Sequence, residues 1–450
     1  MRALPSEVNL EEKFSKVVEE IGRRTPRSRE LHERALRVYP QGVTYALRHV
    51  DPYPVYINRG SGARVWDVDG NSYVDYWIGH GALFLGHRHP EIMRAIQEQL
   101  DYGTHFGFEH ELAVEFAELL TKVLPNVEML RFTNSGTEAN HYAIRLARAY
   151  TGKKVIIKIE GGWHGGVEQL HYNVSYPYGG FESAGIPPDL ERYIRTVPFN
   201  DLDAMEQALK KGDVAAIIME PVLGGTAIPP NQGYLKAVRE LAERYGALLI
   251  FDEVITGFRL ALGGGQEAFG VNADIAVYGK ILGGGLPIGA FGGPSDIMKL
   301  IDVRLPRNER AYHGGTFSAN PLSLAAGMAT VRFLMEHKSL YDEVNERGEF
   351  LRRKLAGICE EKNKLDIHIT GISSITGIHF TRRKPTNHRE AYELRWLDGV
   401  EKLFVMYMRA KGNLIMSEKS PHPLLSVVHE KEHIQKLIDD FSNFLEFLTN

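Results

Sequence analysis

Lys280 stands between a short apolar segment, residues 275–278, and a run of glycines at 283–285. These flanks predict a strand end and a close-packed loop, which would place the amine in a backbone-lined pocket. Burial of an unpaired ammonium is costly, so a desolvated lysine loses its proton more easily than one in water. The neutral amine is a nucleophile that can form a Schiff base with a carbonyl group. Taken alone, the motif fits a surface lysine better, so its neighbours in the fold must decide.

Asp252 follows the apolar segment Ala247–Phe251. An acid at the end of a buried strand is unfavourable unless a cationic group meets it. One interpretation is a carboxylate that caps the next turn. The other is an ion pair with a protonated ring nitrogen, which would make that ring the electron sink that pyridoxal phosphate chemistry requires.

A Ser-Gly-Thr turn, Ser135, Gly136 and Thr137, lies between an apolar segment and a helical one. Free amide groups and hydroxyls at a helix N-terminus favour a phosphate dianion. Either hydroxyl could instead be an ordinary N-cap. The turn carries neither a Walker A lysine nor a Gly-x-Gly-x-x-Gly pattern, which disfavours nucleotide binding.

Trp163 lies in the glycine-rich stretch 161–166, after the apolar segment Val155–Ile159. Its ring could stack on a flat cofactor, because the glycines permit close approach. A core aromatic in a loop is the alternative. We interpret the adjacent His164 as a structural histidine.

Short apolar runs alternate with helical segments through the middle of the chain. Continuous apolar runs are typical of parallel strands that are buried on both faces, and the alternation predicts an α/β sheet whose ligands collect at the carboxyl ends of the strands. The expected strands are Met129–Phe132, Val155–Ile159, Ala215–Met219, Ala247–Phe251 and Ile275–Tyr278. The expected helices are Thr137–Tyr150, Leu202–Lys210, Leu235–Tyr245 and Leu322–Met335.

The two ends of the chain follow other patterns. One helix is expected over Leu10–Arg37, followed by short extended segments and a hairpin that turns at residues 69–71. Near the C-terminus, strands are expected at Ile367–Ile378 and Leu414–Met416, and a closing helix at Glu430–Leu448. We therefore predict three parts: residues 1–85 contribute to a small domain, 86–330 form a large cofactor-binding domain, and 331–450 form the C-terminal α+β domain.

The bulk composition excludes several classes of function. The chain has 450 residues, 24% charged residues and a formal net charge of −4, which gives no electrostatic case for nucleic acid or an anionic membrane. No apolar stretch approaches the roughly 20 residues needed to span a bilayer. Cys359 is the only cysteine, so a disulfide within the chain is impossible and a cysteine-based zinc site is excluded. We expect a cytoplasmic protein without a metal.

Together these motifs resemble the class III pyridoxal-phosphate-dependent aminotransferases, from Tyr39 to the C-terminal helix. The similar segments are residues 66–71, 85–90, 135–139, 219–221, 252–259, 279–280 and 313–321. The resemblance implies fold type I (aspartate-aminotransferase-like), with a large α/β domain around a mostly parallel sheet and a smaller α+β domain. It implies pyridoxal 5′-phosphate as cofactor, with the pyridoxamine form during turnover, and an enzyme that works at least as a homodimer.

The resemblance also implies roles for individual residues. Lys280 would form the Schiff base and move the proton, and Asp252 would pair with the pyridine nitrogen. Val254 and Trp163 would cover the two faces of the ring. Ser135, Gly136 and Thr137 would hold the phosphate, with Thr316 reaching that of the neighbouring subunit. Glu220 would support the site.

Within the family the chain is similar to glutamate-1-semialdehyde 2,1-aminomutase and β-amino-acid transaminases. Ile255 stands where many class III enzymes have a glutamine, and Arg48 matches the arginine that clamps a substrate carboxylate in the aminomutase branch. Trp77 and His80 are further expected substrate contacts. Residues 172–188 occupy the place of a gating loop, although an ordinary surface loop fits them nearly as well.

One departure concerns the pocket wall before residue 426, where Pro421 replaces the acid of the aminomutase branch. An aminomutase must retain its diamine intermediate, whereas a transaminase must release a keto product. We therefore predict transfer of an amino group from an amine or amino acid to a keto acid or aldehyde. The alternatives are the 2,1-aminomutase reaction and, third, amino-acid racemisation. A silent scaffold is disfavoured, since it needs none of these residues.

Overall fold

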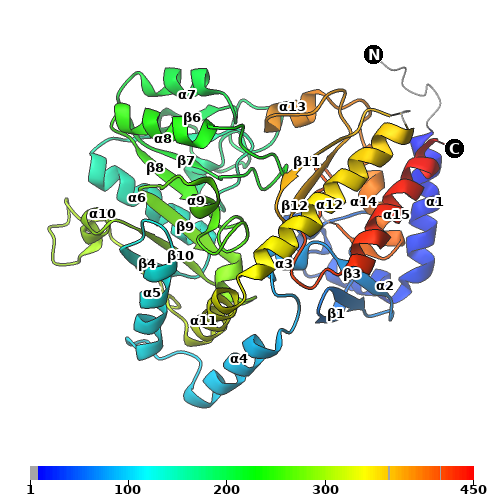
Figure 1. Ribbon diagram of the computed structural model, residues 1–450, viewed down its shortest axis with the longest axis horizontal. Helices are drawn as coiled ribbons and strands as arrows, with labels where there is room; N and C mark the ends of the chain where they lie inside the picture. Colours follow the sequence, from blue (N-terminus) through cyan, green and yellow to red (C-terminus); the bar gives the residue numbers. More distant parts are fainter. Residues whose placement is uncertain (1–8, 363–364, 416, 450) are drawn as a thin grey trace.

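The computed structural model describes residues 9–362, 365–415 and 417–449. Its centre is a seven-stranded sheet in the order β4-β10-β9-β8-β7-β5-β6 (Figure 1). The strands are β4 (Met129–Thr133), β5 (Val155–Ile159), β6 (Ile194–Val197), β7 (Val214–Met219), β8 (Leu248–Asp252), β9 (Ile275–Gly279) and β10 (Gly289–Gly293). All neighbours pair in parallel except β10, which is antiparallel to both β4 and β9. The expected mostly parallel α/β sheet is confirmed.

The five strands expected in this region are present within one residue of their predicted ends. The sequence analysis did not identify β6 or β10. Strand β10 consists mostly of glycine, and a Cβ on Gly289 would lie 2.2 Å from the carbonyl oxygen of Ser135. The glycines therefore allow a close approach of strand to turn, although in sequence they resemble a loop.

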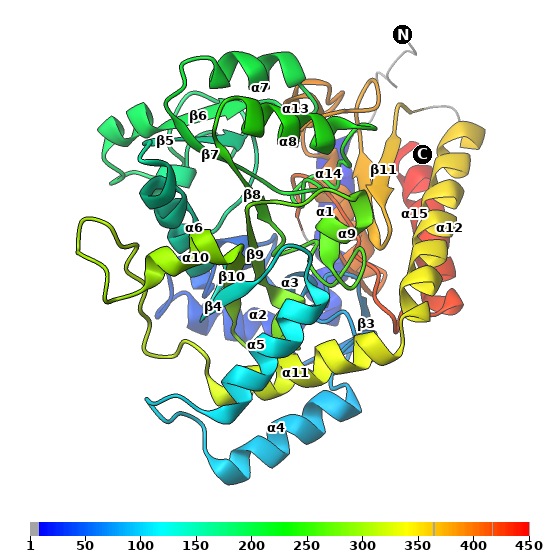
Figure 2. The same ribbon diagram turned by 60° about the vertical axis from the view of Figure 1, so that its left-hand side comes forward.

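Helices cover both faces of this sheet. Because successive residues of a strand face opposite sides, Ile156, Ile218 and Ile250 pack against α6 (Gly136–Thr151), whereas Ile157, Ile217 and Leu249 pack against α7 (Leu202–Leu209) and α8 (Tyr234–Arg244). Further helices of this part are α3 (Ile78–Gly81), α4 (Pro90–Tyr102), α5 (Glu111–Val123), α9 (Gly264–Phe269), α10 (Ser295–Met298) and α11 (Pro321–Glu336). Figure 2 shows α4 and α11 at one end of the molecule and α7 at the other.

The first and last parts of the chain form a second unit of structure. Strands β1 (Ile57–Ser61), β2 (Arg64–Asp67) and β3 (Ser72–Asp75) make an antiparallel sheet, and β13 (Asn413–Leu414) joins β3 in parallel. Around it lie α1 (Leu10–Arg24), α2 (Pro26–Ala35), α12 (Ser339–Lys362), α14 (Val400–Ala410) and α15 (Lys431–Thr449) (Figure 1). Helix α13 (His388–Glu393) lies apart from this sheet, on the side of α7 and α8. The domain limits at residues 85 and 330 remain predictions.

Three local expectations need correction. The single helix over residues 10–37 is two helices, because Pro26 cannot continue α1 and instead begins α2. The strand expected over 367–378 is a hairpin of β11 (His368–Ile372) and β12 (Ile375–His379). Part of the strand expected at 414–416 is β13, while Met416 lies outside the described residues. Among the described helices, none has the length and apolarity needed to cross a membrane.

Candidate active site

Lys280 begins the short 3-10 helix η5 (Lys280–Gly283) directly after β9. Its φ of 49° is unusual for a side-chain-bearing residue and turns the chain sharply at the strand end. Burial lowers the pKa of its amine, although the nearby carboxylates of Asp252 and Glu220 oppose that effect. A Cβ on the preceding Gly279 would lie 3.5 Å from Val254 and 3.7 Å from the backbone nitrogen of Gly136. Lys280 thus stands where β9, the β8 end and the α6 start meet.

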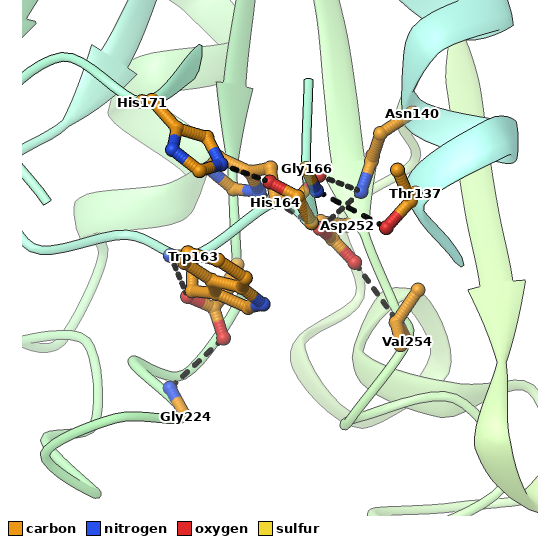
Figure 3. A network of polar contacts seen from close by, with 11 residues as sticks. Thr137, Asn140, Trp163, His164, Gly166, His171, Gly224, Asp252 and Val254 are labelled. Atoms are coloured by element: carbon orange, nitrogen blue, oxygen red, sulfur yellow. Dashed lines mark hydrogen bonds and ion pairs between the residues drawn. The ribbon is translucent and has the colours of Figure 1, made fainter. Parts of the chain in front are cut away.

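Asp252, the last residue of β8, is the hub of the polar network in Figure 3. Its Oδ2 accepts hydrogen bonds from Nδ2 of Asn140 at 2.7 Å and from Nδ1 of His164 at 2.8 Å. Its Oδ1 accepts one from the backbone N–H of Val254 at 3.0 Å. A carboxylate oxygen can accept two donors. The network therefore leaves Oδ1 with capacity for one more.

His164 fixes the orientation of that carboxylate. It is buried, and burial lowers the pKa of its imidazole, which keeps the ring neutral at pH 7. Because the carboxylate accepts, Nδ1 of His164 must carry the proton. Asn140 adds a second donor from inside α6 and also bonds the carbonyl of His164 at 3.3 Å. Asp252 is held in place before any ligand arrives.

The Ser135–Thr137 turn forms the N-terminus of α6. Ser135 is the N-cap, since its side chain accepts from the N–H of Glu138 at 3.2 Å. The N-cap alternative is thus realised for Ser135, but the N–H groups of Gly136 and Thr137 belong to the first turn, which the helix cannot satisfy itself. A Cβ on Gly136 would lie 2.7 Å from Val254. This contact places the turn beside Asp252 and Lys280.

Trp163 is 44% exposed, so it is not a core aromatic. Figure 3 shows its ring beside the Asp252 network, on the other side from Val254. Its backbone N–H approaches Oε1 of Glu220 at 3.4 Å, and Oε2 of Glu220 accepts from Gly224 at 3.0 Å. Burial, with the nearby Asp252 charge, raises the pKa of Glu220 to about 8.

Three expected substrate contacts lie together on the small-sheet side of Lys280. Trp77 and His80 have ring centroids 5.2 Å apart, and the ring of Tyr45 lies 5.8 Å from that of His80. Burial lowers the pKa of His80 to about 4, and the positive charges of Arg48 and Lys280 add to the shift. Arg48 is exposed and donates to the hydroxyl of Thr44 at 2.8 Å.

Thr316 is exposed on the segment that follows α10. The carbonyl of Gly314 accepts a hydrogen bond from the hydroxyl of Tyr142 at 2.6 Å, which ties this segment to α6. A Cβ on the adjacent Gly315 would lie 3.6 Å from Nδ2 of Asn134, so Thr316 is presented on the surface near the phosphate turn.

Sequence reasoning missed some residues of the site. Asn140 was not identified, although a polar side chain on the buried face of α6 was the available signal. His164 was interpreted as structural only, whereas it bonds Asp252. Arg259 was recognised only as the last residue of the similar segment 252–259. It is wholly buried, and its guanidinium donates to the carbonyls of Gly81 and Ile255 while its charge lowers the pKa of Lys280.

The residues fit pyridoxal phosphate. The open acceptor position on Asp252 suits a ring N–H, the first turn of α6 suits a phosphate, and Trp163 and Val254 flank the space between. The amine of Lys280 would then lie beside the aldehyde group of the cofactor. Within the described part of the chain, no cluster of His, Cys, Asp and Glu side chains could hold a metal ion.

Comparison with known proteins settles the family. The model of the aminotransferase class-III family matches residues 45–445. The chain belongs to the class III aminotransferases. Members use pyridoxal phosphate, so the expected cofactor and enzyme class are confirmed. The chain is 43% identical to the glutamate-1-semialdehyde 2,1-aminomutase of Methanothrix thermoacetophila over 93% of its own length and 96% of that protein.

Solved structures of the family share the fold over nearly the whole chain. The β-phenylalanine aminotransferase of Variovorax paradoxus has a TM-score of 0.87 and 30% identity, with 97% of each chain covered. The glutamate-1-semialdehyde aminomutase of Pseudomonas aeruginosa PAO1 has a TM-score of 0.88 and 26% identity, with 97% and 98% covered. The sequence analysis placed intermolecular transfer first and the aminomutase second. The relatives support the aminomutase better.

The lowered pKa of Lys280 predicts an unusual reactivity in the cofactor-free protein. A buried amine becomes neutral at lower pH than an exposed one. With limiting trinitrobenzenesulfonate, labelling of Lys280 should therefore reach its plateau at a lower pH than labelling of the exposed Lys299. Peptide mapping by mass spectrometry measures both rates in one sample. Equal pH profiles for the two lysines would contradict the lowered pKa.

Proposed function

We propose that the protein catalyses the 2,1-exchange of the amino group within glutamate 1-semialdehyde. The observation that carries amino transfer is the meeting of Lys280, Asp252 and the Ser135–Thr137 turn at the carboxyl ends of β9, β8 and β4. The identity with the Methanothrix aminomutase supports this reaction within the family. Arg48 lies close enough to His80 for its charge to lower the pKa of that residue. It supports a substrate with a carboxylate, because a guanidinium matches a carboxylate with two hydrogen bonds.

Each residue has a defined part in the proposed reaction. When bound, pyridoxal phosphate supplies an electron-withdrawing ring that stabilises negative charge on the adjacent substrate carbon. Asp252, oriented by His164 and Asn140, holds the ring nitrogen in its protonated form. The neutral amine of Lys280 would move a proton between the nitrogen-bearing substrate carbon and C4′ of the cofactor, which carries the amino group from one substrate position to the other. The first turn of α6 anchors the phosphate.

Intermolecular transamination is the second candidate, favoured by the wall around Pro421. The carbonyls of Pro421 and Pro423 accept hydrogen bonds from Ile378 and Thr376, at 3.0 and 3.2 Å, so this segment runs along β12. Between them, the ring of His422 lies 5.2 Å from that of Trp77. Burial lowers the pKa of His422, so its ring carries no charge at pH 7. With Pro421 in place of the acid, this part of the wall lacks the carboxylate that would retain a diamine.

Product analysis separates the two candidates. The purified protein, loaded with pyridoxamine phosphate and freed of keto acids, is given glutamate 1-semialdehyde alone. The aminomutase proposal expects many turnovers to the isomeric amino ketone. Failure with that substrate, together with rapid transfer from an amine donor to pyruvate or 2-oxoglutarate, would reverse the order.

Replacement of Arg48 tests the proposed carboxylate contact. Arg48→Ala should raise KM for glutamate 1-semialdehyde about 10- to 100-fold, because a bidentate charge-assisted contact contributes about 1.5–3 kcal/mol. The KM for a simple amine donor without a carboxylate should hardly change. Arg37→Ala is the matched control, since Arg37 is exposed in the same N-terminal part. Equal effects on both substrates would remove Arg48 from the site.

We further propose a cytoplasmic homodimer in which Thr316 completes the phosphate site of the partner subunit. The exposed side chain of Thr316, close to the α6 N-terminus, supports this arrangement. Large exposed apolar side chains on nearby segments support an interface, among them Tyr102, Phe108, Tyr312 and Phe317.

A further inference from the structure

Helix α13, from the C-terminal part of the chain, lies against the loop that carries Trp163. Its first residue, His388, packs directly on the backbone of Gly161. A Cβ at position 161 would lie 2.0 Å from Cγ of His388, and the φ of Gly161 is +75°. Only glycine fits both requirements without strain. The imidazole therefore sits on the chain two residues before Trp163.

An ion pair joins the same helix to the end of β5. Arg389 contacts the carboxylate of Glu160 with two nitrogens, at 2.7 Å through Nη2 and 3.1 Å through Nε. Glu160 is buried and its backbone N–H donates to the carbonyl of Val197 at 2.9 Å. A bidentate pair of this kind fixes direction as well as distance. Arg389 thus holds the residue that precedes Gly161.

The segment 172–181 is attached to the same two residues of α13. The hydroxyl of Tyr178 is hydrogen bonded to Nδ1 of His388, and the guanidinium of Arg389 lies 5.0 Å from the centre of the Tyr178 ring. The carbonyl of Asn173 accepts from the N–H of Gly161 at 2.9 Å. This first part of the candidate gating loop, residues 172–188, is therefore bonded both to the Trp163 loop and to α13.

The charges around His388 allow it to remain a neutral partner. Burial lowers its pKa to about 3, and the positive charges of Lys158 and Arg395 contribute to the shift. A neutral imidazole can form a hydrogen bond with the phenol of Tyr178 without placing an unpaired charge in a buried site. Tyr392, one turn along α13, stacks on His388 with ring centroids 4.7 Å apart and restricts the orientation of the imidazole.

We infer that Glu160, Tyr178, His388 and Arg389 form a clamp through which α13 positions the Trp163 loop over the cofactor site. This α13 clamp rests on the proposed function only in that Trp163 covers the cofactor ring. Its members touch neither cofactor nor substrate, so they are positioning residues. Displacement of α13 would release the Trp163 loop and the 172–181 segment together.

Hydrogen exchange of the cofactor-free protein tests the clamp directly. Arg389→Gln and Tyr178→Phe should each speed exchange in peptides covering 161–166 and 173–181 about fivefold or more, since local opening follows the loss of charge-assisted and buried hydrogen bonds. Arg383→Gln is the matched control, because Arg383 pairs with Glu390 of the same helix at 2.7 Å but not with Glu160. That variant should leave both peptides unchanged.

Two further measurements separate positioning from general stability. The same variants should weaken cofactor binding about fivefold and reduce the circular dichroism of the bound cofactor, with a smaller effect on KM for substrate. The double variant Arg389→Gln with Glu160→Gln should weaken cofactor binding no more than either single variant does, as expected when both residues act through one shared contact. If Arg389→Gln does not fold, the same measurements on Tyr178→Phe, which removes only one oxygen atom, decide whether the clamp exists.

The outcomes distinguish the clamp from the proposed function. Unchanged exchange at 161–166 in both variants would overturn the clamp, even if wild-type protein converts glutamate 1-semialdehyde. Faster exchange and a weaker cofactor signal in both variants would support the clamp, even if the wild-type protein fails with that substrate.

Discussion

Lys280→Ala should lower kcat by at least about 10⁴-fold, because no other amine in the site can take its place as base and nucleophile. Lys158, which is buried in β5, donates its amine to the carbonyl of Tyr172 at 2.9 Å and is held away from this role. The measurement is the rate of conversion of glutamate 1-semialdehyde under single-turnover conditions. The protein should still bind the cofactor, since Asp252 and the α6 turn remain.

Lys299→Ala is the control for this substitution, because Lys299 is exposed and has no part in the proposed site. It should retain wild-type rates and the yellow colour of the loaded enzyme. Residual turnover above about 1% in Lys280→Ala would show that another group performs the proton transfer.

Asp252→Asn should have the second largest effect, a fall in kcat of about 10³-fold or more. The amide has nearly the same shape as the carboxylate, but it lacks the negative charge that keeps a ring nitrogen protonated. It would also set an N–H or a neutral oxygen against the donors of Asn140 and His164, which now converge on Oδ2. Cofactor affinity, measured by titration of the cofactor-free protein, should fall together with kcat.

His164→Gln provides the companion experiment to Asp252→Asn. It removes a donor to the carboxylate but leaves the charge, so we expect a smaller loss, about 10-fold in kcat. A loss as large as that of Asp252→Asn would mean that the carboxylate acts only through its hydrogen bonds with His164 and not through its charge.

The parts of the site that could be predicted are those with a local signal. Lys280, Asp252 and the Ser135–Thr137 turn each follow an apolar strand, and parallel strands bring their carboxyl ends to one edge. The bond between Asn140 and Asp252 spans 112 positions of the chain, and that between Arg389 and Glu160 spans 229. A local sequence pattern cannot predict which residues pair over such separations.

The fold was misread where two physical requirements compete. Strand β10 was not identified because glycine weakens a strand, yet close packing on Ser135 requires its glycines. The order of the two activities depended on one position, Pro421, which describes only one wall of the site. Similarity along the whole chain supports the other order.

The most direct test of the account is the location of the bond between cofactor and protein. Wild-type enzyme loaded with pyridoxal phosphate is treated with borohydride, digested and mapped by mass spectrometry. We predict a reduced pyridoxyl group on the peptide that contains Lys280 and on no other. A group on Lys158, or no attachment to any lysine in a protein that turns over substrate, would contradict the assignment of this site.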